Sequence, residues 1–224
     1  MSGPVESLHD RGRAAVLAGT ESVDVPPNPS SPRWGLSVLL RPDDDCAGRL
    51  ADQAAQLAAL AGPHHWQTGG RGASHLTVCV LEPFREGVTP DDPHVRRAAA
   101  ALSRAAARSA PVQFRLSGLL LAPGGVLAGG TPINPPAHRL RRIVADELGE
   151  AGRFEGSYRA DRWWSTLLHF AGPVLDRCGL LDWVDARRTL DLGPLAADRL
   201  ELVRYAYDGG RTVPVPLASF PLGR

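Results

Sequence analysis

Short apolar runs with strand character recur along this chain, and stretches with helical spacing lie between them in no regular order. A parallel α/β sheet needs a steady alternation of strands and crossover helices, which is missing here. The irregular order therefore predicts an α+β fold with antiparallel sheets. The runs that read as strands are 34–40, 75–81, 112–121, 126–128, 164–170, 199–207 and 212–220. The stretches that read as helices are 47–61, 93–108, 137–149 and 174–187.

The first 32 residues differ from the rest of the chain. They end in Val-Pro-Pro-Asn-Pro-Ser-Ser-Pro, and proline fits neither a helix interior nor a sheet ladder. A short helix between Glu6 and Ala18 would need a partner to pack against. We therefore predict a flexible N-terminal tail over residues 1–32 and a single bilobal domain over residues 33–223.

Charge and cysteine content restrict the function classes. The formal net charge is only +1, which is not the basic footprint of a strongly nucleic-acid-binding domain. The three cysteines lack CxxC spacing, so neither a disulfide framework nor a zinc site is indicated. No apolar run has the length of a signal peptide or a membrane span. We expect a cytoplasmic protein that uses neither a metal nor a membrane.

One candidate for chemistry is the sequence His75-Leu76-Thr77 at the start of an apolar run. Residues two apart in a strand point to the same face, so His75 and Thr77 should project together. A histidine followed by a threonine at this spacing also arises by chance, and a strand histidine with a satisfied hydrogen bond is the plain alternative.

A second apolar run, Trp163 to Phe170, also carries a histidine near its end. His169 is followed by Phe170, Ala171 and a Gly-Pro stop. The two histidines lie one in each half of the chain. Two such runs in one sequence are less easily explained by chance than one.

This arrangement resembles the 2H phosphoesterase superfamily, the 2′-5′ RNA ligase-like and cyclic-phosphodiesterase proteins. Those proteins carry two His-x-Thr/Ser motifs on strands from two lobes. The resemblance also takes in the opening run 34–40 and the closing hairpin around Gly209 and Gly210, and it covers about 33–223. It implies two pseudo-symmetric lobes of antiparallel sheet, with flanking helices around a central cleft.

The resemblance implies different catalytic roles for the two histidines. His75 and His169 would act as acid and base in the in-line opening of a 2′,3′-cyclic phosphate, because imidazole has its pKa near neutrality. Thr77 would donate a hydrogen bond to a phosphate oxygen. The substrate would be a nucleotide or an RNA end, with no cofactor.

The second motif departs from the pattern at Ala171, where a threonine or serine is expected. Ser165 lies four residues before His169. In a regular strand Thr166 would face away from His169. On this basis neither residue replaces the missing hydroxyl.

Four further residues are candidates for substrate binding. Trp66 and Tyr158 precede the two motif runs and could stack on a base, although core packing is the stronger interpretation of Trp66. Arg71 and Arg159 could form bidentate contacts with a phosphate, and an exposed arginine is the alternative for each.

Two rival interpretations stay open. The first is a nucleotide- or RNA-binding protein on the same fold whose catalysis has decayed, an interpretation that Ala171 favours. The second makes the histidines core residues of an interaction domain. Convergence of His75 and His169 on one cleft would speak against the second.

Overall fold

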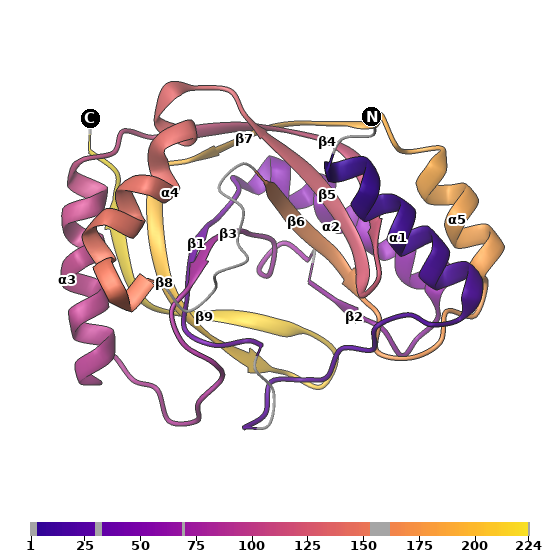
Figure 1. Cartoon of the computed structure of the whole chain (residues 1–224), viewed down its shortest axis with the longest axis horizontal. Coiled ribbons are helices and arrows are strands. Elements are labelled where there is room, and N and C mark those ends of the chain that lie inside the picture. Colours follow the sequence, from indigo (N-terminus) through magenta and orange to yellow (C-terminus); the bar gives the residue numbers. More distant parts are fainter. Residues whose placement is uncertain (1–3, 30–32, 69, 153–161, 224) are drawn as a thin grey trace.

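The protein is described by a computed structural model that covers residues 4–29, 33–68, 70–152 and 162–223 (Figure 1). Helices and strands alternate irregularly, as predicted. The helices are α1 Pro4–Ala18, α2 Asp44–Ala61, α3 Pro93–Ala107, α4 Pro135–Leu148, the 3-10 turn η1 Gly149–Gly152 and α5 Arg177–Asp185. The strands are β1 Ser37–Leu40, β2 Trp66–Gln67, β3 Leu76–Val80, β4 Val112–Ala122, β5 Gly125–Pro132, β6 Trp163–His169, β7 Asp191–Ala197, β8 Arg199–Tyr207 and β9 Thr212–Pro221.

The strands form two separate antiparallel sheets. A four-stranded sheet has the order β3-β1-β8-β9, and a five-stranded sheet has the order β2-β6-β5-β4-β7. Every recorded pairing between neighbouring strands is antiparallel. These sheets confirm the α+β prediction with two lobes. Strand β7 was not predicted, because its Gly193-Pro194 pair reads as a turn.

Local signals set the starts of four helices. Side-chain oxygens of Asp43, Asp92, Asn134 and Asp176 each accept a backbone N–H of the first turn of α2, α3, α4 and α5. Proline follows the capping residue in α3 and α4, where its missing N–H costs nothing. These caps explain why the predicted helices lie close to the observed ones.

The helices cover the outer faces of the two sheets. Helix α3 packs on β8 and β9, with α4 beside it at one end of the molecule, and α1 and α5 lie together at the other end (Figure 1). Helix α2 packs against β6 and β7. The apolar core is therefore continuous across both lobes. The remaining faces of β3 and β6 are left for the site described below.

The predicted flexible tail over residues 1–32 is wrong for the part that the structure describes. Helix α1 packs on β4, and its Val16 is fully buried in the core. Beyond α1, the backbone N–H groups of Ser22 and Asp24 donate to the carbonyls of Pro123 and Phe170, at 2.8 and 2.7 Å. Sequence alone did not reveal β4 as the partner that the helix needed. The prolines fit because this segment is neither helix nor ladder strand.

Cys46, Cys79 and Cys178 all lie among the described residues, and none of them forms a disulfide. Within the described residues, no helix is long and apolar enough to cross a membrane.

A close approach of two backbones holds α1 in place. A Cβ added to Gly12 would lie 2.5 Å from the backbone carbon of Leu121 in β4. Alanine normally favours a helix over glycine by roughly 0.8–1 kcal/mol. At this position we expect the opposite effect of alanine. Gly12→Ala should lower the free energy of unfolding by about 1–3 kcal/mol, because the added methyl overpacks the contact.

Chemical denaturation with a linear extrapolation measures this effect. Leu17→Ala is the control, since Leu17 lies on the same helix and is 56% exposed, so that its removal should change stability by less than about 0.5 kcal/mol. A Gly12→Ala protein as stable as the unmodified chain would contradict the proposed packing.

Candidate active site

The first half of the site is built on β3. His75 immediately precedes the strand, and Thr77 follows two residues later on the same face. The pairing of β3 with β1 then slips: Val38 pairs with Cys79 and Leu39 pairs with Thr77, which leaves Val78 as a bulge. A bulge changes the alternation of a strand, so Val80 returns to the face of His75 and Thr77.

The second half of the site is built on β6 by the same device. In the pairing of β6 with β5, Val126 pairs with Leu168 and Leu127 pairs with Thr166, which leaves Leu167 as a bulge. Trp164 and Thr166 share a face by strand alternation, and the bulge brings His169 to that face as well.

The two strands therefore present equivalent positions to one cleft. Each supplies a first residue, a second residue two places later and a third residue five places later, with a bulge between the second and third. Trp164 matches His75 and Thr166 matches Thr77, while His169 matches Val80. The histidines thus both belong to the site without being equivalent to each other.

This register corrects the prediction about the missing hydroxyl. Thr166, which a regular strand would turn away, lines the cleft because of the bulge at Leu167. Ala171 lies beyond the strand, and its backbone N–H donates to Nδ1 of His65 at 3.0 Å. The second lobe therefore keeps its threonine. What differs from the expected motif is Trp164 in the place of a histidine.

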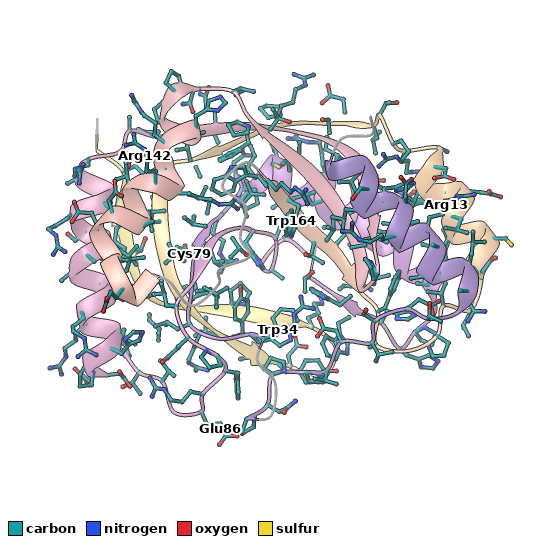
Figure 2. All side chains as sticks on the ribbon, in the orientation of Figure 1. Arg13, Trp34, Cys79, Glu86, Arg142 and Trp164 are labelled. Atoms are coloured by element: carbon teal, nitrogen blue, oxygen red, sulfur yellow. The ribbon has the colours of Figure 1, made fainter. Side chains whose placement is uncertain are left out.

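The cleft has a volume of about 340 Å³ and lies between the two sheets. It brings together the three predicted residues His75, Thr77 and His169. Figure 2 shows two further lining residues, Trp34 and Trp164, near the centre of the molecule. The complete lining is Arg33, Trp34, Ser37, His75, Thr77, Val80, Trp164, Thr166, His169 and Tyr205.

His75 is held by its backbone surroundings. Its Nδ1–H donates to the carbonyl of Ala73 at 2.6 Å, and the hydroxyl of Tyr205 lies 3.3 Å from Nε2. Burial lowers the pKa of His75 to about 4, and the charges of Arg41 and His169 add to that direction. At neutral pH the ring is therefore uncharged, with a lone pair on Nε2.

His169 has a carboxylate for a partner instead. Its Nδ1 lies 2.8 Å from Oδ2 of Asp24, and both side chains are nearly inaccessible, at 6% and 4%. Burial lowers the pKa of His169, while the hydrogen bond and charge of Asp24 act in the opposite direction. Although burial opposes it, the pKa of Asp24 is also lowered, by the hydrogen bond from His169 and the charge of Arg33.

Two aromatic rings lie between the histidines. The ring of Trp34 lies 4.8 Å from that of His169 and 5.3 Å from that of Tyr205, measured between centroids. Trp34 has a φ of +64°, a region that residues other than glycine seldom adopt, and its Nε1–H donates to the carbonyl of Val25 at 3.1 Å. The hydrogen bond and ring contacts hold this conformation against its backbone cost.

The predicted substrate-binding residues lie elsewhere. Trp66 is 5% exposed on β2, where it pairs with His169 and packs behind it without lining the cleft. This burial fits the core-packing interpretation of Trp66. Arg71 lies against α2, with its guanidinium 3.4 Å from the carbonyl of Asp44 and not in the cleft lining. Tyr158 and Arg159 lie outside the described residues.

Sequence reasoning missed several residues of the site. Trp164-Ser165-Thr166 repeats the spacing of the first motif, and this was the readable signal for the second lobe. Tyr205 had weaker support from its place on the closing hairpin. Nothing near Asp24 indicates that it would reach His169, because the contact joins segments far apart in the chain.

A metal site was not predicted. Among the residues that the structure describes, no group of three or more His, Cys, Asp or Glu side chains is placed to hold a metal ion.

Comparison with solved structures shows which fold this is. The chain is similar to a protein of Thermus thermophilus, with a TM-score of 0.61, 19% identity and coverage of 84% of this chain and 98% of that one. A second similar structure, described as a phosphoesterase, has a TM-score of 0.56 and 16% identity, and the match covers 85% of this chain and 99% of that one. E. coli LigT complexed with 3′-AMP has a TM-score of 0.54 and 14% identity, and the match covers 85% of this chain and 99% of that one. These likenesses confirm the 2H phosphoesterase-like fold. Comparisons with protein-family models and with curated proteins found no match.

A loss of stability in mild acid follows from the surroundings of His75. The unfolded imidazole takes up a proton below its ordinary pKa of 6.5, whereas the folded one stays neutral down to about 4. The unfolded state then binds more protons, so the free energy of unfolding falls as the pH drops from 6.5 toward 4. His75→Asn lacks this titration, and we expect a flatter pH dependence in denaturant melts.

The control is His138→Asn, which removes an exposed histidine on α4. In this variant the free energy of unfolding should depend on pH as steeply as in the unmodified protein. The other buried histidines are present in both variants and in the unmodified protein, so they contribute equally to all three pH dependences. Equal slopes for His75→Asn and the unmodified chain would show that His75 is protonated alike in both states.

Proposed function

We propose that this protein is a phosphoesterase that opens a 2′,3′-cyclic phosphate, or a related 2′-linked nucleotide or RNA end, by acid–base catalysis. One observation carries the proposal: two imidazoles and two threonine hydroxyls, from both lobes, line one cleft. Hydrolysis of a cyclic phosphate needs a base on one side of the phosphorus and an acid on the other. The cleft offers such groups from opposite strands.

The two histidines are suited to different roles. His75 is neutral and its Nε2 carries a lone pair, because Nδ1–H is used on the carbonyl of Ala73. It takes a proton from water as the water oxygen bonds to phosphorus. His169, whose protonated form is favoured by Asp24, gives a proton to the ribose oxygen as its bond to phosphorus breaks. One proton is taken up and one released, so the reaction balances.

The two threonines suit the developing charge on the phosphate. Thr77 and Thr166 occupy equivalent places on the two strands and both line the cleft. Their hydroxyls donate to the two non-bridging oxygens, which gain charge in the transition state. No metal or cofactor takes part in this scheme.

Size and surroundings of the cleft fit a nucleotide. Its volume of about 340 Å³ falls in the usual range of small-ligand sites, roughly 300–1,000 Å³. Trp34, Trp164 and Tyr205 provide aromatic surface for a base, and Arg33 provides positive charge at the rim. Solved structures of E. coli LigT hold phosphate and 3′-AMP, ligands of the same chemistry.

One observation favours a second function, that of a nucleotide-binding protein without catalysis. Trp164 stands where the symmetry of the strands would place the partner of His75. On this alternative His169 is a buried structural residue, paired with Asp24, and Trp164 is a stacking surface. The protein would then bind nucleotides such as 3′-AMP without turning over a cyclic phosphate.

Hydrolysis of nucleoside 2′,3′-cyclic phosphates, measured in the presence of a chelator, separates these functions. We expect turnover by the unmodified protein and losses of roughly 10²- to 10⁴-fold in both His75→Ala and His169→Ala, because each removes an acid or a base. Resolving the 2′- and 3′-phosphate products identifies the leaving oxygen. His138→Ala, an exposed position, is the matched control.

A loss confined to His75→Ala would remove His169 from the mechanism. No turnover by the unmodified protein, together with 3′-AMP binding that Trp164→Ala weakens, would establish the binding function instead.

Exchanges of the hydroxyl groups test the register of the second strand. Thr77→Val and Thr166→Val should each lower turnover by roughly 10²- to 10³-fold, since each removes one donor to the transition state. Thr166→Ser keeps the donor and should retain most activity. Ala171→Thr adds a hydroxyl beyond the strand and should change turnover little. An increase in turnover in Ala171→Thr with no loss in Thr166→Val would place the functional position at 171.

A further inference from the structure

Asp24 belongs to the segment between α1 and β1, far in sequence from both motif strands. Its backbone N–H donates to the carbonyl of Phe170 at 2.7 Å, beside His169. Upstream in the same segment, the N–H of Ser22 donates to Pro123 at 2.8 Å. The segment is therefore fixed along the end of β6, and it carries an acidic side chain toward the interior.

The carboxylate of Asp24 is buried and surrounded by specific partners. Its side chain is 4% exposed, with Oδ2 lying 2.8 Å from Nδ1 of His169 and 2.9 Å from a guanidinium nitrogen of Arg33. The other oxygen accepts the N–H of Val25 at 3.1 Å. A buried carboxylate without such partners would be strongly unfavourable. The contacts also leave it little freedom to rotate.

We propose that Asp24 is the positioning residue of His169: it accepts Nδ1–H, fixes the tautomer and orientation of the ring, and keeps Nε2 for the substrate. This inference rests on the proposed function, in which His169 donates the proton. The segment between α1 and β1, which precedes both motif strands in the sequence, thereby becomes part of the proposed active site. A carboxylate that orients an imidazole and stabilises its protonated form is a known device of acid–base catalysis.

The two histidines of the cleft are held in contrasting ways. His75 donates its Nδ1–H to a neutral carbonyl, which orients the ring without favouring a positive charge. Nδ1 of His169 lies 2.8 Å from a carboxylate oxygen of Asp24, a partner that can orient the ring and also favours a positive charge on it. Burial lowers the pKa of both rings, but only His169 has a carboxylate that opposes this shift, a difference that suits His169 to the acid role and His75 to the base role.

Three charged or titratable groups act on His169, and they differ in sign. Asp24 favours its protonated form, whereas the positive charge of Arg33 disfavours it. His75 is the third group, since the charges of the two histidines oppose each other across the cleft. Opposite signs from Asp24 and Arg33 make the proposal testable with two substitutions.

The experiment is a side-chain NMR titration of the histidines in the full chain. Asp24→Asn keeps an acceptor and removes the charge, so we expect the Nδ1–H tautomer to persist and the pKa of His169 to fall. Asp24→Ala removes both, and we expect a mixture of tautomers. Arg33→Gln should move the pKa of His169 upward. Turnover of a cyclic phosphate should fall on the order of 10- to 100-fold in Asp24→Asn, as for other orienting partners of histidine.

Glu21→Gln is the matched control. It makes the same change of charge in the same segment, at a residue that pairs with Arg177 and not with His169. We expect the tautomer and pKa of His169 to be unchanged. This control separates the contact with His169 from a general loosening of the segment.

The NMR titration and the turnover assay test different parts of the proposal. A His169 that titrates identically in Asp24→Ala and the unmodified protein overturns the positioning role, whatever the activity. Unchanged turnover in Asp24→Asn, with a shifted pKa, overturns its importance for the reaction. An inert unmodified protein whose His169 still follows Asp24 overturns the proposed function alone.

Discussion

A strand presents every second residue to one face, and this alternation decides which side chains can meet in the cleft. Regular strands would leave His169 facing away from Trp164 and Thr166. The bulges at Val78 and Leu167 alter the alternation at equivalent points of β3 and β6. The site depends on these two bulges, because each brings the residue five places after the first, Val80 or His169, to the face that lines the cleft. Bulges next to functional sites are common for this reason.

Burial of two imidazoles in one cleft brings an electrostatic constraint. Each ring loses hydration, which disfavours the charged form of both. Two positive rings would also repel each other across the cleft. The structure meets this constraint unequally, because only His169 is given a carboxylate. Asp24 therefore opposes the lowering of the pKa at His169, whereas the pKa of His75 is lowered without an opposing carboxylate.

Patterns within one segment were readable from the sequence, and contacts between segments were not. Apolar spacing and capping residues located α2 to α5, and the strand pattern around His75 and Thr77 placed both in the cleft. The register of β6 was misread because a bulge leaves no local sequence signal. Trp164-Ser165-Thr166 repeats the spacing of His75-Leu76-Thr77, but it has tryptophan in the place of the histidine, so its likeness to the first motif is weak in the sequence. The role of Asp24 depends on a segment whose prolines suggested a tail.

The segment that carries Asp24 connects helix α1, at one end of the molecule, to the cleft between the two sheets. Gly12 lets α1 approach β4, the chain leaving α1 runs past the end of β6, and Asp24 on that chain reaches His169. Segments near a terminus generally open more easily than a core strand, and their stability depends on how they are tied down. Here the ties are the backbone hydrogen bonds of Ser22 and Asp24 and the contact of the Asp24 carboxylate with His169. Because Asp24 lies on the chain that leaves α1, opening of this segment would take its carboxylate away from His169. The helix is thereby connected through this one segment to a cleft whose lining contains none of its residues.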